Sequence, residues 1–208
     1  RQDRTNPRAD WYVWSDTPSR PDIPCGPVPT FGTSAWTWDE VRGQYYFHRF
    51  REAQPDLNFW NPDVASAALD VARFWLDRGV DGFRLDVAGL LFESAAGCSL
   101  IPETTAYFGD LRGLLDGYPD RAMVAEPVWF GSTAPFFGNG RDMFHMAFDL
   151  DFVFGWPGYF DTAAAQPLAD HFTSVQQGLP PGAQNAIQLG NHDVPRACER
   201  VNGVTSRW

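Results

Sequence analysis

The sequence of 208 residues contains no lysine, and all 16 of its basic residues are arginine. This absence excludes, within this chain, mechanisms that need a lysine amine, such as Schiff-base formation or a phosphate-binding P-loop. The net charge of −10 has the opposite sign to that of a nucleic-acid-binding domain. No apolar run approaches the length of a membrane-spanning helix. We therefore expect neither a nucleic acid nor a membrane among its partners.

Cysteine is scarce, and Cys25, Cys98 and Cys198 lie far apart in the sequence without a CxxC spacing. An odd number of distant cysteines predicts neither a disulfide framework nor a zinc site, so we expect reduced, structural thiols. Unpaired cysteines are typical of the cytoplasm, which is the location we predict. Because no second histidine lies at ligand spacing from His192, we also expect no metal site.

The first 60 residues are rich in Pro, Gly, Trp and Asp and show no sustained period, which predicts an irregular, loop-rich subdomain. The pattern changes at Asn61, a good N-cap that is followed by Pro62 at the first position of a helix. Gly79 is expected to end this helix. The apolar positions that recur at helical spacing, and that we expect to face the core, are Val64, Ala68, Val71 and Trp75.

The rest of the chain alternates between strand-like and helix-like segments. Strands are predicted at residues 80–87, 121–126, 144–154 and 186–191, and helices at residues 102–115 and 166–177. This alternation indicates an α/β fold with a parallel sheet and right-handed crossovers. The strands are too few to close an eight-stranded barrel, and an open part of a barrel would expose its edges. We therefore expect a piece of a longer chain, inactive and poorly folded by itself.

Three carboxylates each close a short, apolar, strand-like run: Asp86, Glu126 and Asp193. Acids at the carboxyl ends of successive strands are typical of the active face of an α/β barrel. A carboxylate nucleophile paired with a carboxylic acid is the arrangement that breaks a glycosidic bond. The order and placement of the three motifs therefore predict a glycosidase. An aromatic content of 15% suits a cleft that stacks on sugar rings, although aromatic residues more often form the core.

The surroundings of each carboxylate suggest a role for it. Alternate residues of a strand share a face, so Arg84 and Asp86 should both point into the barrel, where the buried arginine would keep the Asp86 carboxylate ionised. The simpler interpretation is a structural ion pair. Glu126, at the end of an apolar strand, is expected to have a raised pKa and to donate a proton, although a solvent-facing glutamate is more common. His192 fits a hydrogen bond to a substrate hydroxyl better than a metal ligand.

Together, the motifs at residues 81–86, 123–126 and 191–193 resemble those of the α-amylase superfamily of glycoside hydrolases. The resemblance implies that Asp86 is the nucleophile and Glu126 the general acid/base. It implies that Asp193 grips the sugar hydroxyls and stabilises the transition state, with Arg84 and His192 as substrate-site residues.

The resemblance covers nearly the whole chain and implies its domain organisation. Residues 1–60 resemble the end of the inserted, loop-rich B domain of the family. Residues 61–208 resemble part of a TIM (β/α)8 barrel, from about helix 3 to strand 7. The motif that the family carries at the end of strand 3, with an Asp and a His, does not occur in this chain.

Other segments are similar to the oligo-1,6-glucosidase branch: residues 6–14, 54–58 and 191–196, in which Arg196 would line the acceptor side. Val87 resembles the residue of α-1,6-cleaving members more than that of maltases. The implied activity is hydrolysis, with retention, of α-1,6 and/or α-1,4 bonds in short gluco-oligosaccharides. The two carboxyl groups would lie about 5–5.5 Å apart. No cofactor is implied, apart from a structural calcium ion in the complete protein, outside this chain.

Two alternatives remain open. Residues 92–93, 102–104 and 144–148 are similar to trehalose synthases, which move glucose instead of giving it to water, whereas residues 195–196 argue against that branch. The second alternative is a non-catalytic family member that serves as a binding or chaperone subunit. Such members usually lose catalytic carboxylates, but the three visible ones remain here.

Overall fold

The computed structural model describes residues 4–26, 32–127, 131–140, 142–161 and 165–200, without the side chains of residues 159–161. The chain forms two compact units. Unit 1 consists of residues 1–80 and 89–114, and unit 2 consists of residues 81–88 and 115–208. Each unit is described by itself.

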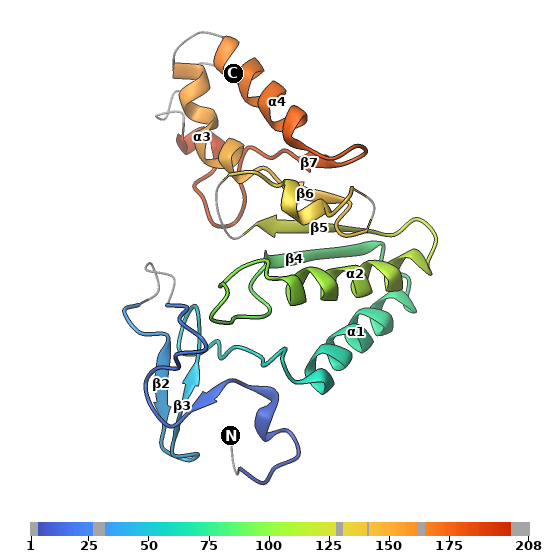
Figure 1. Ribbon diagram of the computed structural model, residues 1–208. Helices are drawn as coiled ribbons and strands as arrows, with labels where there is room; N and C mark the ends of the chain where they lie inside the picture. The colour runs from blue at the N-terminus through green and yellow to red at the C-terminus, as the bar shows by residue number, and fades with distance from the viewer. Residues whose placement is uncertain (1–3, 27–31, 128–130, 141, 162–164, 201–208) are drawn as a thin grey trace. The chain divides into compact units, whose positions relative to one another are not determined.

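Unit 1 contains a small antiparallel sheet in the segment that we predicted to be irregular (Figure 1). Its strands are β1 (Trp14–Ser15), β2 (Trp36–Asp39) and β3 (Gln44–Phe47), in the order β1-β3-β2, and the 3-10 helix η1 (Ala9–Trp11) precedes them. Strands of two to four residues are too short to show a period, which is why the sequence did not predict them. The buried residues that pack together here are Val13, Ile23, Cys25, Ala35, Trp36 and Phe47.

The two long helices of unit 1 are α1 (Pro62–Leu76) and α2 (Pro102–Asp116), as the sequence predicts. The Asn61 side chain accepts a hydrogen bond from the Asp63 N–H, which confirms the predicted N-cap of α1. The predicted buried face of α1 is partly wrong, because Val71 is 59% exposed and Trp75 is 50% exposed. The residues of α1 that are buried are Val64, Ala72 and Leu76. The buried stripe is thus turned by about one residue, since spacing alone does not show which apolar row meets a neighbour.

Cys25 and Cys98 form a disulfide within unit 1, and Cys198 is free and exposed. The prediction of reduced thiols is therefore wrong for two of the three cysteines. These two residues are separated by 73 positions in the sequence but by 5.7 Å between their Cα atoms. Only the fold creates this proximity, which cysteine spacing does not reveal. Because two of the three cysteines are paired, the cysteines no longer support the predicted cytoplasmic location.

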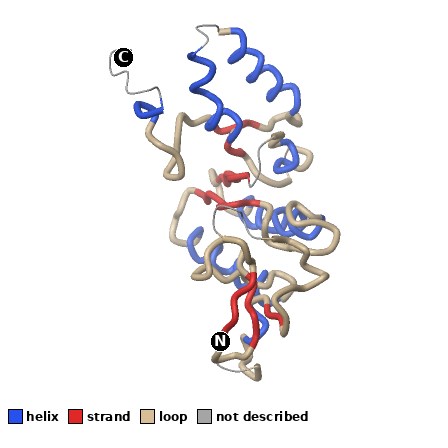
Figure 2. Tube along the Cα trace, turned by 90° about the vertical axis from the view of Figure 1, so that its left-hand side faces the viewer, coloured by secondary structure: helices blue, strands red, loops and turns tan. Residues whose placement is uncertain are grey.

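Unit 2 is built on a parallel sheet of four strands, which confirms the predicted α/β class (Figures 1 and 2). The strands are β4 (Gly82–Ala88), β5 (Ala122–Pro127), β6 (Met146–Phe148) and β7 (Gln184–Ala186), in the order β4-β5-β6-β7. A side chain at Gly82 would place its Cβ 1.8 Å from the Ala122 carbonyl oxygen, so the close pairing of β4 with β5 requires glycine there.

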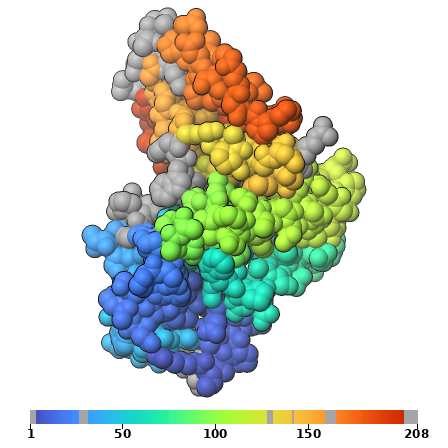
Figure 3. Space-filling model, viewed as in Figure 1, coloured from blue at the N-terminus to red at the C-terminus, as the bar shows by residue number. Residues whose placement is uncertain are grey.

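The predicted third and fourth strands are both wrong in extent. β6 is only three residues long, because α3 (Leu150–Asp161) begins soon after it. The Asp149 side chain caps the start of α3 by accepting a hydrogen bond from the Phe152 N–H. The last strand, β7, ends at Ala186 because it pairs only with the short β6. Helix α4 (Gln166–Gly178) is found as predicted and has no buried residue; its outer side is visible in orange in Figure 3. Within the described ranges, no helix is both long and apolar enough to cross a membrane.

Candidate active site

Two of the predicted carboxylates meet at the carboxyl ends of the neighbouring strands β4 and β5 in unit 2. Arg84 lies between them: its Nη1 atom is 2.6 Å from Asp86 Oδ1, and its Nη2 atom is 2.6 Å from Glu126 Oε1. Parallel strands place their carboxyl ends at the same edge of the sheet, which is why residues about 40 positions apart converge. Asp86, Glu126 and one shared arginine thus form a single charged cluster.

The pKa of Glu126 is raised, chiefly because the carboxyl group is buried and also because it shares a hydrogen bond with Asp86. Arg84 and the Val87 N–H lower this pKa but do not reverse the shift. The side chain of Glu126 is 10% exposed and that of Asp86 is 65% exposed. The geometry therefore suits Glu126 as the proton donor and leaves Asp86 open to an incoming ligand.

The predicted burial of Arg84 and Asp86 is wrong, because their side chains are 34% and 65% exposed. The four-stranded sheet of the described residues is open, so no further strands cover the face that carries these side chains.

A bulge in β4 contributes a backbone group that the sequence did not reveal. Leu85 pairs with Ala125, but Ala88 pairs with Pro127, so β4 has one extra residue at this point. Val87 has a φ of 40°, a conformation that is rare for a β-branched residue. Its N–H donates a hydrogen bond of 3.3 Å to Glu126 Oε2. Such strain persists where the surroundings enforce it, often at functional sites.

The third motif lies in an irregular segment after β7. Asp193 and its neighbour His192 are exposed, with His192 Nε2 3.3 Å from Asp193 Oδ2, and the Asp193 N–H donates a hydrogen bond to Asn191 Oδ1. Arg196 is exposed as well. Among the described residues, no hydrogen bond or ion pair joins these three side chains to the cluster around Arg84. The structure thus brings together Arg84, Asp86, Val87 and Glu126 but not the residues of the third motif.

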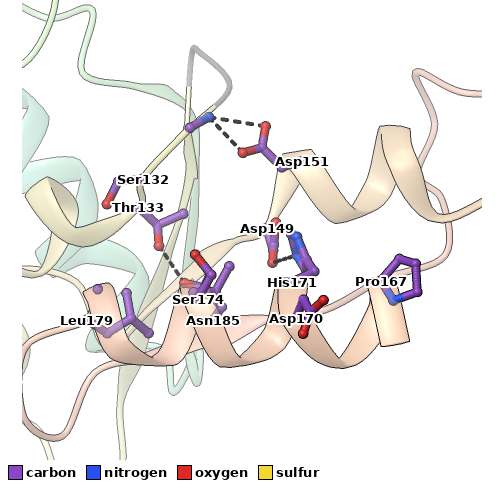
Figure 4. A pocket seen from close by; sticks show the side chains of 13 residues that line it. Ser132, Thr133, Asp149, Asp151, Pro167, Asp170, His171, Ser174, Leu179 and Asn185 are labelled. Atoms are coloured by element: carbon purple, nitrogen blue, oxygen red, sulfur yellow. Dashed lines mark hydrogen bonds and ion pairs between the residues drawn. The ribbon is translucent and has the colours of Figure 1, made fainter. Parts of the chain in front are cut away.

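A second polar site in unit 2 was not predicted (Figure 4). It is a cavity of about 600 Å³ beside α4 that includes none of the predicted site residues. Its buried Asp149 accepts a hydrogen bond from the Phe152 N–H and contacts His171 Nε2 at 2.8 Å. Asp149 Oδ1 therefore caps the start of α3, and Asp149 Oδ2 joins it to α4, which is a structural role. An aspartate before an apolar run was the available signal.

No three His, Cys, Asp or Glu side chains of the described residues are placed to hold a metal ion together. The charged cluster around Arg84 consists of a carboxyl group with a raised pKa, a more exposed carboxyl group and the guanidinium between them.

Comparison with known proteins finds relatives that match nearly the whole of this chain. The family described as "Alpha amylase, catalytic domain" matches residues 1–207. The trehalose synthase/amylase of Mycolicibacterium smegmatis is 41% identical over 203 residues, which cover 93% of this chain and 33% of that protein. The "Probable alpha-glucosidase" of Rhizobium meliloti is 35% identical, covering 99% of this chain and 42% of that protein. The crystal structure of an α-glucosyl transfer enzyme gives a TM-score of 0.76 at 35% identity, covering 98% of this chain and 42% of that one. The chain thus spans well under half the length of each.

Proposed function

Since the chain belongs to the α-amylase family of glycoside hydrolases, we propose that it carries the catalytic carboxylates of a retaining enzyme that acts on α-glucosidic bonds. The observation that carries the proposal is the pairing of Asp86 and Glu126 through Arg84 at adjacent strand ends. One carboxyl group has a raised pKa and is nearly buried, and the other is open to solvent. This asymmetry is what an acid and a nucleophile require.

In the proposed reaction, Glu126 protonates the glycosidic oxygen while the Asp86 carboxylate attacks the anomeric carbon. The bond to the leaving group breaks, and a covalent glucosyl-enzyme forms. Glu126 then takes a proton from water, whose oxygen displaces Asp86 and releases glucose with retained configuration. A sugar that binds between the two carboxyl groups would have to replace their mutual hydrogen bond. Asp193 would grip the sugar hydroxyls.

His192 and Arg196 would bind substrate, and Val87 would influence whether α-1,6 or α-1,4 bonds are cleaved. Residues 1–60 would be the end of an inserted B domain, and residues 61–208 would be part of the barrel. The substrate would be a small α-glucoside or oligosaccharide, with no cofactor; any structural calcium would lie outside this chain.

A transglucosylase, such as a trehalose synthase, is the second candidate. It is favoured by the 41% identity to the mycobacterial trehalose synthase/amylase and by the likeness to an α-glucosyl transfer enzyme. Both reactions share the glucosyl-enzyme and differ only in the acceptor, which is water in one and a sugar hydroxyl in the other. The carboxylate pair supports both equally.

Proton NMR of the full-length protein with isomaltose, maltose and trehalose would separate the two candidates. Release of α-glucose as the first anomer would identify a retaining α-glucosidase. Interconversion of maltose and trehalose with little free glucose would identify a transglucosylase. No change in any of these sugars, with folded protein, would count against both candidates and favour a non-catalytic member.

Substitution of the carboxylates tests their assignment. Asp86→Asn and Asp193→Asn should remove nearly all activity, and Glu126→Gln should lower kcat by about 10²–10⁴-fold. Asp81→Asn is the matched control, because Asp81 directly precedes β4 at its other end and pairs with Arg121 on the surface. A folded Asp86 or Glu126 variant with normal turnover would refute the assignment.

A further inference from the structure

The small sheet of unit 1 has two different faces. In antiparallel pairs, residues directly opposite each other share a face. Trp36 lies opposite Phe47, and both side chains are buried in the core, with tilted rings whose centroids are 5.1 Å apart. Trp14 lies opposite Tyr46 on the other face, with ring centroids 6.1 Å apart in an edge-on arrangement. Two large aromatic side chains therefore stand on the face that does not form the core.

This second face borders a cavity of about 440 Å³. The cavity is lined by Tyr12, Trp14, Asp39, Tyr46, Glu52, Ala53 and Pro55, all of unit 1. Its volume falls within the range of about 300–1,000 Å³ that is typical of small-molecule sites. Aromatic walls with a few polar groups are the usual lining of such sites. Tyr12 is 37% exposed, so the cavity has an accessible aromatic ring at its edge.

The chemistry of the lining restricts the ligand. The two carboxylates and the absence of any basic residue among the lining side chains disfavour phosphates and other anions. The guanidinium of Arg42, which does not line the cavity, stacks 4.3 Å from the centre of the Trp14 ring, so one face of Trp14 is already covered by a cation. A neutral ligand with an apolar ring face and many hydroxyl groups fits best. Aromatic rings would stack on its face, and carboxylates would accept its hydroxyl hydrogen bonds.

We propose that this cavity is a second carbohydrate-binding site, which holds a glucosyl unit of an oligosaccharide and shares no residue with the carboxylate pair. The choice of a sugar among neutral ligands rests on the proposed function. Asp39 Oδ1 already accepts the N–H groups of Val41 and Arg42, so Glu52 is the principal hydrogen-bond acceptor for the ligand. Tyr46 also fixes the wall, because its hydroxyl donates a hydrogen bond to the Glu52 carbonyl oxygen.

The test is calorimetric titration of maltoheptaose into the full-length protein carrying Asp86→Asn, so that the sugar stays intact. We expect two classes of binding site. Adding Tyr12→Ala or Glu52→Gln should weaken one class at least about 10-fold, equal to about 1.4 kcal/mol. Tyr12→Phe keeps the ring and should stay within about 3-fold. In the active background, these substitutions should leave turnover of disaccharides unchanged.

Trp38→Ala is the matched control, because Trp38 is 47% exposed on the same sheet and does not line the cavity. It should leave both classes intact. A single class that is insensitive to Tyr12→Ala, or equal losses in the Trp38 and Tyr12 variants, would overturn the proposal. If the active protein transforms no α-glucoside but a Tyr12-dependent class remains, only the proposed function fails. If the active protein transforms an α-glucoside but has no Tyr12-dependent class of binding site, only the proposed second site is overturned.

Discussion

Arg84 is the residue on which the arrangement of the proposed active site depends most. Two carboxyl groups that share one arginine repel each other when both are ionised, and the guanidinium that touches both offsets this repulsion. The same contact limits how far burial raises the pKa of Glu126. The residue therefore influences both the charge of the site and the pH range in which Glu126 can donate a proton.

Replacing Arg84 with Gln should raise the pKa of Glu126 further, because a group that lowers it is lost. If Glu126 is the acid, the alkaline limb of the kcat/KM profile should move to higher pH, with lower activity throughout. Arg121→Gln is the control, since Arg121 pairs with Asp81 beyond the other end of the strands. An alkaline limb that stays in place would contradict Glu126 as the acid.

Glu93 is a buried carboxyl group in unit 1 whose pKa is raised to about 8 by burial and by repulsion from Asp56. The nearest cation, Arg49 Nη1, is 3.7 Å from Glu93 Oε1, too far for a hydrogen bond, and lowers the pKa only partly. Glu93 therefore keeps its proton at neutral pH in the folded protein. A raised carboxyl pKa stabilises the fold fully below the unfolded value, near 4.5, and this stabilisation is lost as the pH rises through about 8.

Glu93→Gln should remove this dependence. Relative to the unsubstituted protein, the variant should gain unfolding free energy as the pH rises from about 4.5 to about 8, by up to about 1.4 kcal/mol per pH unit. Urea unfolding at several pH values measures the difference. Glu103→Gln, at an exposed position at the start of α2, is the control for the same substitution at the surface. A difference for Glu93→Gln that does not change with pH would refute the buried-proton interpretation.

At the scale of elements, the bulge in β4 determines how the strand end meets β5. The extra residue turns the backbone of Val87 into the left-handed region, where its N–H reaches Glu126. A straight strand would have left Glu126 without this donor. The cost is a conformation that disfavours side chains with a Cβ by about 1–2 kcal/mol.

The relative stability of the Gly and Ala variants at position 87 tests whether Val87 adopts this strained conformation. At position 87, Gly should be more stable than Ala by about 1 kcal/mol, because glycine adopts a positive φ without strain. At Leu85, an ordinary position of the same strand, Ala should be more stable than Gly. Denaturant unfolding of the four variants gives both differences. The same order at both positions would show that Val87 is not strained.

At the scale of the whole molecule, the predicted α/β fold, a partial barrel of the α-amylase family, is confirmed. The division into two compact units does not follow the chain, because unit 1 takes up residues 89–114 and unit 2 takes up residues 81–88. The Cys25–Cys98 disulfide joins the two sequence segments of unit 1. It is therefore a constraint on tertiary structure and not on any single element.

Loss of this disulfide should destabilise the protein markedly. Closing a loop of about this length restricts the unfolded chain, so Cys98→Ser should lower the free energy of unfolding by about 4 kcal/mol. A reducing agent should have the same effect on the unsubstituted protein. Cys198→Ser is the control, because Cys198 is free and exposed. The free energy of unfolding of this variant should not change. Two reactive thiols in Cys198→Ser under oxidising conditions would show that the bond does not form.

Local sequence patterns were enough to predict the Asn61 cap, the helices that begin at Pro62, Pro102 and Gln166, and the strands that carry Asp86 and Glu126 near their carboxyl ends. Each depends on neighbouring residues and on a period that a short window contains. The three motifs also identified the family.

Which distant groups meet depends on the tertiary structure and is not visible in the sequence. The tertiary structure joined Cys25 to Cys98, placed Arg84 between two carboxyl groups, and turned Val87 toward Glu126. These contacts follow from strand register and chain packing, which a linear pattern does not encode. For the same reason, the sequence overestimated the strand before Asp193, because a strand extends only as far as its neighbour pairs with it.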